Sequence, residues 1–287
     1  MAITVRQLTS ADVDWAAAVL AATGLRARQP ELRRYLSLEP TGYYAAEAGG
    51  RPVGVGGYVA YESLAFVGNM AVAQEFQGRG VGRAILTRLL DDIDRRRIPE
   101  TLLEATPEGE RLYRKCGFVD AHWTMAYSRV GELPGGGGAG PAVAALAKAD
   151  LDAVAAFDAP RFGAERRRVL ERFLDDFPVR GFVVRRSGGR VAGYLIAQAR
   201  ILGPWVAEDA EAAESLMRVG LALPFDAPAV AYAPAPNAAA AALFAHLGFA
   251  AHWESLRMRR RGPGAPPAAG PVGRPECLYG LAALAIG

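Results

Sequence analysis

The sequence predicts an α+β protein with two similar halves, each a mixed, mainly antiparallel sheet flanked by helices. Three observations lead to this prediction: alternating strand and helix patterns, a short pattern that occurs twice, and one glycine run between its copies. The run, Gly135 to Gly138, would lose too much backbone entropy in a packed element, so it indicates a linker. We therefore expect a first domain over residues 1–130, a linker over 131–141 and a second domain over 142–287.

The repeated pattern joins a short helix, a glycine turn and a strand. Its first copy is Leu112–Phe118, followed by His122-Trp123, and its second copy is Leu243–Phe249, followed by His252-Trp253. Each half also opens with a strand and an acidic helix start. Such self-similarity indicates a duplicated domain.

Hydrophobic periodicity orders the elements of the first half. A Gly-Gly pair between two of its strands is typical of a hairpin. The expected strands are 3–8, 42–48, 52–60, 64–73, 101–106 and 118–128, and the expected helices are 11–22, 30–37, 80–96 and 108–115. Near the other end, the apolar piece Cys277–Ile286 is too long to stay exposed, so we expect it to return to a sheet.

Composition argues against several classes of protein. The chain has 51% hydrophobic and 22% charged residues, a net charge of +3 and scattered arginines, which makes a nucleic-acid partner a poor prediction. Two cysteines, Cys116 and Cys277, cannot form a disulfide framework or a cysteine-based zinc site. The N-terminal stretch lacks the features of a signal peptide, and no apolar run reaches the roughly 18 residues of a membrane helix. These features predict a soluble, cytoplasmic protein without bound metal.

One segment carries the strongest chemical signal. The strand that ends at Val72 runs into Gln77-Gly78-Arg79-Gly80-Val81-Gly82 and then into an amphipathic helix. Closely spaced glycines bring backbone N–H groups near a ligand, and the helix N-terminus adds free donors and a positive dipole end. The segment therefore predicts an anion site suited to a pyrophosphate. It matches neither the dinucleotide fingerprint, because Arg83 stands where the third glycine should be, nor the Walker pattern.

At these residues the chain resembles the GCN5-related N-acetyltransferases, or GNAT family. Gln77-x-x-Gly80-x-Gly82 after Met70-Ala71-Val72 is similar to the family's coenzyme A motif, and Leu112-Tyr113-x-x-x-Gly117-Phe118 is similar to its next motif. The resemblance covers residues 3–128 and implies two GNAT-like domains with acetyl-CoA as the cofactor. It also implies that the strand edge at Met70, Ala71 and Val72 pairs with the pantetheine arm. The residues implied in holding the pyrophosphate are Gln77, Gly78, Arg79, Gly80, Val81, Gly82 and Arg83.

Acetyl transfer to an amine passes through a tetrahedral oxyanion and then expels a thiolate. The resemblance implies that the backbone N–H of Val72 stabilises the oxyanion and that Tyr113 contacts the cofactor and protonates the thiolate. A phenol is protonated at neutral pH, so Tyr113 can act as that acid. Packing on an amphipathic helix is the alternative interpretation of Tyr113.

The general base is less clear from the sequence. Glu104 lies in the apolar strand 101–106, and some relatives use a glutamate on that strand. A solvent-facing carboxylate is an equally good interpretation of Glu104. His122 is a second candidate, and a water chain with no dedicated base is a third.

The second half lacks this chemistry at the corresponding positions. Its helix start carries Glu208, Asp209 and Glu211 in place of glycines, and these acids would repel a phosphate. Phe244 stands where the first half has Tyr113, whereas Asn237 fits the family's helix-start asparagine. We therefore expect a degenerate GNAT-like domain that shapes the acceptor pocket. The candidates for lining that pocket are Trp205, Tyr232 and Trp253.

The sequence thus predicts an enzyme that transfers an acetyl group from acetyl-CoA to a primary amine of a small molecule by direct attack. Two alternatives stay open, a peptide or protein N-acetyltransferase and a non-catalytic acyl-CoA sensor. The expected partner is a small-molecule amine, and we expect no nucleic acid and no membrane. Either a monomer or a homodimer would fit.

Overall fold

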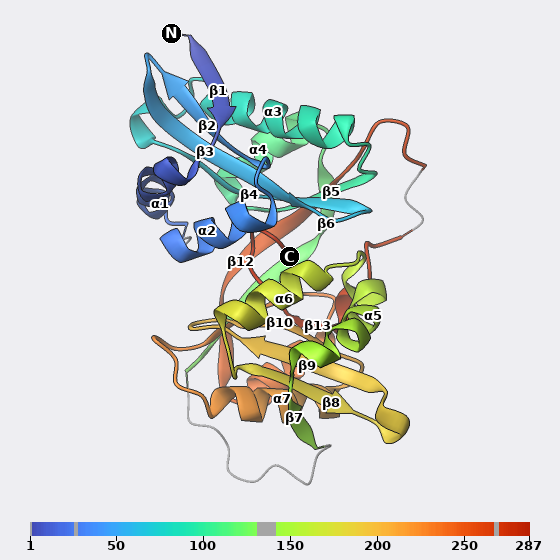
Figure 1. Cartoon of the computed structure of the whole chain (residues 1–287). Helices are drawn as coiled ribbons and strands as arrows, with labels where there is room; N and C mark the ends of the chain where they lie inside the picture. Colours follow the sequence, from blue (N-terminus) through green and yellow to red (C-terminus); the bar gives the residue numbers. More distant parts are fainter. Residues whose placement is uncertain (1, 26–27, 131–141, 267–269) are drawn as a thin grey trace. The chain divides into compact units, whose positions relative to one another are not determined.

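The computed structural model describes residues 2–25, 28–130, 142–266 and 270–287 (Figure 1). Its chain forms two compact units. Unit 1 comprises Met1–Asp120, Met258–Pro267 and Ile286, and unit 2 comprises Ala121–Arg257, Ala268–Ala285 and Gly287. The predicted linker at 131–141 lies outside the described residues.

Unit 1 has the predicted order of elements, with boundaries within two residues of those expected. Its sheet runs β1-β2-β3-β4-β5, antiparallel except for the parallel pair β4 and β5. The strands are β1 (Ile3–Gln7), β2 (Tyr43–Ala48), β3 (Arg51–Ala60), β4 (Leu64–Val72) and β5 (Glu100–Ala105), and the helices are α1 (Val13–Ala22), α2 (Gln29–Leu38), α3 (Val81–Arg95) and α4 (Pro107–Lys115).

Helices cover both faces of this sheet (Figure 1). On one face α3 packs closely because β3 carries Gly54 and Gly56, where an added Cβ would lie within 3.0 Å of the Ile85 side chain. On the other face Tyr35 of α2 stacks on Tyr43 of β2 at 6.3 Å, and the Tyr43 ring lies over Gly57 of β3. The close approach of α3 fixes its N-terminus beside the end of β4.

Unit 2 repeats the same order, which confirms the predicted duplication. Its main sheet runs β13-β10-β9-β8-β7, while β11 pairs with β6 and β6 neighbours β12. The strands are β6 (Val119–Arg129), β7 (Val143–Ala145), β8 (Gly181–Arg185), β9 (Val191–Ala197), β10 (Leu202–Ala207), β11 (Val230–Pro234), β12 (Phe249–Arg261) and β13 (Leu278–Gly280), and the helices are α5 (Leu151–Phe162), α6 (Arg167–Asp176), α7 (Ala210–Leu221) and α8 (Ala238–His246).

Two strands contain residues that belong to the unit formed mainly by the other half of the sequence. Residues 121–129 of β6 belong to unit 2, and residues 258–261 of β12 belong to unit 1. In unit 1, β12 follows β5 in the sheet, and Arg259 forms a salt bridge of 2.9 Å with the buried Glu100. The sequence-based division at 130 and 142 follows the covalent repeat and stays a prediction.

The apolar piece near the end of the chain returns to a sheet, as predicted, because Leu278–Gly280 form β13 beside β10. Its side chains are buried: Leu278 is 4% and Tyr279 2% exposed. This strand completes the apolar core of unit 2, in which Tyr279 packs with residues of β10 and α8.

Candidate active site

The strand β4 contains a bulge that opens the sheet of unit 1. Asn69 adopts a left-handed backbone with φ 54°, and the register with β3 shifts between Val55 and Gly57. The parallel ladder with β5 ends at the pair Val67 and Leu103. Although β4 is a central strand, its residues after the bulge are mostly half-exposed, whereas those before it are buried. The two strands therefore part after Val67.

The backbone groups of β4 beyond the bulge face this gap. The N–H of Ala73 donates to the carbonyl of Val53 at 2.9 Å, and Ala71 is paired with Val55. Because alternate residues of an antiparallel strand bond to the same side, the N–H and C=O groups of Met70 and Val72 point away from β3. This geometry supplies a free strand edge and an N–H group at Val72.

The glycine segment lies directly after this edge. Gly78 and Gly80 have positive φ of 72° and 86°, with open space where a side chain would be, and Gly80 is the N-cap of α3. A Cβ on Gly82 would lie 3.7 Å from Val72 and 3.5 Å from Leu112, so β4, α3 and α4 meet there. The predicted loop and helix start are therefore present together, beside the open strand edge.

This segment fits a pyrophosphate. Within the described part of the chain, the backbone N–H groups of residues 78–83 donate to no backbone carbonyl. The first turn of α3 carries no acidic residue, while Arg79 and Arg83 are exposed beside it. Free amides, a helix N-terminus and nearby cations are the groups that bind an anion in other proteins, and the binding of a pyrophosphate at residues 78–83 stays a prediction.

Tyr113 lies on the buried face of α4. Its ring packs against Gly109, where an added Cβ would be 2.7 Å away, and meets Phe118 edge-on with ring centroids 5.9 Å apart. Burial raises the pKa of the Tyr113 phenol to about 12, and the hydroxyl bonds to no other described residue. A protonated phenol without a protein partner can donate its proton to a ligand.

The two candidate bases differ in position. Glu104 is half-buried and directly follows Leu103, the last residue of β5 that pairs with β4. It therefore lies where the strands part. His122 belongs to unit 2, where burial and the charge of Arg257 lower its pKa to about 4. Neither position establishes a general base.

Sequence reasoning did not anticipate Asn69. This residue forms the bulge and donates from Nδ2 to the Tyr43 hydroxyl at 3.3 Å. A signal existed, because Gly68-Asn69 interrupts an apolar strand and asparagine tolerates the left-handed region.

The corresponding helix start in unit 2 is satisfied by its own acids, as predicted. The Asp209 carboxylate accepts from the N–H of Ala212 at 2.9 Å. Asp209 also forms a salt bridge with Arg186 at 2.6 Å, and Glu208 forms one with Arg190 at 2.5 Å. The prediction that Trp205 lines a pocket is wrong, because its side chain is fully buried against Phe244 and Tyr279.

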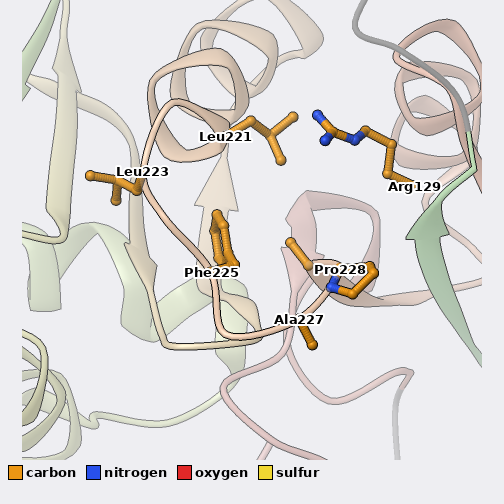
Figure 2. Close-up of a pocket in the computed structure, with 7 residues that line it drawn as sticks. Arg129, Leu221, Leu223, Phe225, Ala227 and Pro228 are labelled. Atoms are coloured by element: carbon orange, nitrogen blue, oxygen red, sulfur yellow. The ribbon is translucent and has the colours of Figure 1, made fainter.

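Unit 2 contains a pocket of about 350 Å³. Figure 2 shows the Arg129 guanidinium pointing toward Leu221, with Phe225 nearby. Arg129 is the one charged residue that lines it, since the others are Leu221, Leu223, Phe225, Ala227, Pro228 and Ala229. The lining offers no acid, base or nucleophile for acyl transfer.

Residues 2–25, 28–130, 142–266 and 270–287 contain neither a membrane-spanning helix nor a cluster of metal ligands. No helix there is long and apolar enough to cross a membrane. Nor do His, Cys, Asp and Glu residues gather there in groups that could hold a metal ion.

A parted parallel strand pair followed by the glycine-rich segment 77–83, here called the glycine cradle, is typical of proteins that bind an acyl-CoA thioester. The comparisons identify the family. Models of the acetyltransferase (GNAT) domain match residues 39–120 and 154–272. The chain belongs to the GNAT family, with two such domains in tandem, and is an acyl-CoA-dependent N-acetyltransferase. Enzymes of this family act on amine acceptors.

Solved structures resemble the chain over most of its length. A candidate acetyltransferase from Pyrococcus horikoshii is 25% identical, with 99% of this chain and 96% of that chain covered and a TM-score of 0.84. A GCN5-related N-acetyltransferase from Sphaerobacter thermophilus is 15% identical, with 94% and 98% covered and a TM-score of 0.66. One from Anabaena variabilis is 14% identical, with 90% and 72% covered and a TM-score of 0.62. The last two show the fold alone. A comparison with curated proteins gave no match.

Proposed function

We propose that this chain transfers an acetyl group from acetyl-CoA to a primary amine of a small molecule by direct attack. The observation that supports it best is the meeting of three features in unit 1. The free edge of β4 at Val72, the glycine cradle and α4 with Tyr113 converge around Gly82. The choice of acetyl rather than a longer acyl group follows the domain models that match the chain.

The residues of the cradle and the strand edge bind the thioester. When bound, acetyl-CoA supplies an activated acetyl group. The amides of residues 78–83 would hold the pyrophosphate, with Arg79 and Arg83 adding positive charge. The edge at Met70–Val72 would pair with the pantetheine arm through the N–H and C=O groups of Met70 and the N–H of Val72, which point away from β3. The Val72 carbonyl already accepts from the Gln77 side chain.

Three groups would then act during transfer. The N–H of Val72 would stabilise the oxyanion, because it is fixed in the strand and points into the gap. Tyr113 would protonate the leaving thiolate, since its hydroxyl stays protonated and has no protein partner. Glu104 would accept the amine proton, because it lies where the strands part.

The hydrogen-bonding groups beside the bulge support a small acceptor. Tyr43 is fully buried, and its hydroxyl accepts the hydrogen bond from Asn69. An amine that approaches Val72 past these polar groups would meet hydrogen-bonding partners within unit 1. A slim, free amine fits such a setting better than a bulky chain segment.

The test is release of free thiol from acetyl-CoA across a library of small amines and a matched library of peptides. We expect release with one class of small primary amine and little with peptides. Preference for peptides would overturn the small-molecule assignment. Tight acetyl-CoA binding without release for any amine would leave the sensor as the better hypothesis. Light scattering would show whether the chain is a monomer or a homodimer.

A further inference from the structure

In unit 2 the strands β10 and β11 correspond to β4 and β5 of unit 1, and they part in the same way. One isolated parallel bridge joins Ile201, directly before β10, to Val230 at the start of β11. Beyond it β13 lies between them. It pairs with β10 at Trp205 and Gly280 and at Val206 and Leu278, and the N–H of Leu281 donates to the carbonyl of Tyr232 on β11 at 2.8 Å.

Two buried side-chain amides hold this segment from its ends. Asn237 caps α8 by accepting from the N–H of Ala240 at 2.9 Å, and its Nδ2 donates to the carbonyl of Leu278 at 3.0 Å. Gln198 donates from Nε2 to the carbonyl of Ala282 at 2.7 Å. Both amides are at most 5% exposed, and each donates one N–H to the segment beside its other bond, from Ala240 to Asn237 and from Gln198 to the Gly203 carbonyl.

The fit leaves no room for a second occupant. A Cβ on Gly280 would lie 2.0 Å from the carbonyl oxygen of Leu202, and one on Gly203 would lie 2.2 Å from that of Leu281. Tyr279 packs on Trp205 with ring centroids 5.2 Å apart. Phe244, at the repeat position of Tyr113, meets Trp205 at 5.8 Å. A closed aromatic cluster thus replaces the free phenol of unit 1.

We propose that residues 278–282 occupy the groove of the second domain in place of a pantetheine arm, so that the chain binds one acyl-CoA. An extended peptide that adds to a strand edge makes the main-chain hydrogen bonds that such an arm would make. The phosphate cradle is replaced as well, because Asp209 caps α7 and the neighbouring acids pair with Arg186 and Arg190. Both parts of a cofactor site are therefore filled by the chain itself.

The first measurement is the stoichiometry of coenzyme A binding to the full chain by calorimetry. We expect one molecule per chain. Two molecules per chain would overturn this proposal. This proposal rests on the proposed function in one respect, namely that unit 1 binds the cofactor. If no coenzyme A binds to the chain, the proposed function is contradicted and not the proposal about unit 2.

The second measurement is hydrogen exchange followed by mass spectrometry. Without ligand, the amides of residues 278–282 should already be as protected as core strands, and coenzyme A should not change their exchange. The amides of residues 78–83 should become protected only when coenzyme A is added. Rapid exchange of residues 278–282 in the free protein would show that the groove is open and would sink the idea.

A substitution tests the fit directly. Gly280→Ala should raise exchange in residues 202–207 and 278–282 by about tenfold or more, because the added Cβ meets the Leu202 carbonyl. Coenzyme A affinity in unit 1 should stay within about twofold. Gly270→Ala is the matched control, since no atom of the described residues lies within 4 Å of its added Cβ. Equal exchange in both variants would contradict the proposal. If Gly280→Ala fails to fold, the two wild-type measurements still decide.

Discussion

The side-chain amide of Gln77 donates a hydrogen bond from Nε2 to the backbone carbonyl of Val72 over 3.1 Å. Val72 ends the free edge of β4, and Gln77 begins the glycine cradle, so this bond holds two parts of the site together. It also satisfies a carbonyl that faces the gap. The glutamine of the motif therefore has a positioning role that does not require it to touch a ligand.

Replacing this glutamine should weaken acetyl-CoA binding. Gln77→Ala loses a bond whose net contribution is about 1 kcal/mol, so we expect the Kd to rise about fivefold to tenfold. Calorimetry on the purified variant measures this directly. Gln74→Ala, an exposed glutamine in the preceding turn, is the control and should bind like wild type. Equal Kd values for both variants would show that the bond does not order the cradle.

A charge at the N-cap of α3 should abolish acetyl-CoA binding. Gly80→Asp places a carboxylate in the phosphate cradle at a position with φ 86°, so repulsion and backbone strain act together. We expect at least about a hundredfold rise in Kd. Gly80→Asn keeps the backbone strain without the charge, so its Kd should lie between those of wild type and Gly80→Asp. Gly50→Asp, with φ 76° in the turn between β2 and β3, carries the same strain outside the site and should bind normally.

Removing the Tyr113 hydroxyl should slow turnover while leaving acetyl-CoA binding intact. Loss of a general acid lowers kcat by about a hundredfold, whereas the Phe ring keeps the packing against Gly109 and Phe118. Thiol release gives kcat, and calorimetry gives Kd. Unchanged turnover in Tyr113→Phe would refute the acid role. Because the phenol pKa is about 12 in the free protein, Tyr113 should not cause loss of activity below pH 10.

Local patterns were enough to predict most of the first half. The apolar stripe and the glycines place α3 at 80–96 from sequence, against Val81–Arg95 in the structure. The cradle follows from the same residues, since glycine spacing and a helix start are local features. In unit 2 the acids within residues 208–211 are also a local feature, and they predict that this helix start does not bind a phosphate.

Features that depend on distant partners could not be predicted. The pattern of a strand specifies which of its faces is buried, but it does not specify which strand lies beside it. The sequence therefore contains no signal that residues 121–129 belong to unit 2. From the sequence alone, a position in a pocket wall and a position in the core are equally good interpretations of Trp205. Its burial depends on Tyr279, which follows 74 residues later in the chain (279 − 205).

His122 should make the protein less stable in acid. Burial and the charge of Arg257 lower its folded-state pKa from 6.5 to about 4. The unfolded chain therefore takes up a proton first as the pH falls below 6.5, and the free energy of unfolding declines until about pH 4. The loss approaches about 3 kcal/mol. It disappears well above pH 6.5, where the imidazole is neutral in both states.

Urea unfolding at several pH values checks this contribution. His122→Gln cannot titrate, so its loss of stability between pH 7 and pH 4.5 should be smaller than that of wild type. At pH 8 any difference between the two proteins reports packing alone, and this difference is subtracted. Parallel pH profiles for variant and wild type would show that His122 is protonated equally in the folded and unfolded chains.

Arg166 and Asp158 form a buried ion pair in unit 2 whose disruption should destabilise the fold. Arg166 donates from Nε to one carboxylate oxygen at 2.7 Å and from Nη2 to the other at 2.9 Å. The two side chains are 2% and 0% exposed, and the Tyr194 hydroxyl donates to the same carboxylate at 2.6 Å. Arg166→Met leaves this carboxylate buried without its cation, which costs about 3–5 kcal/mol. The double variant Arg166→Met with Asp158→Leu removes both charges and should recover most of that loss in urea unfolding. If the double variant is no more stable than Arg166→Met alone, the lost stability comes from packing of the Arg166 side chain rather than from the unpaired charge.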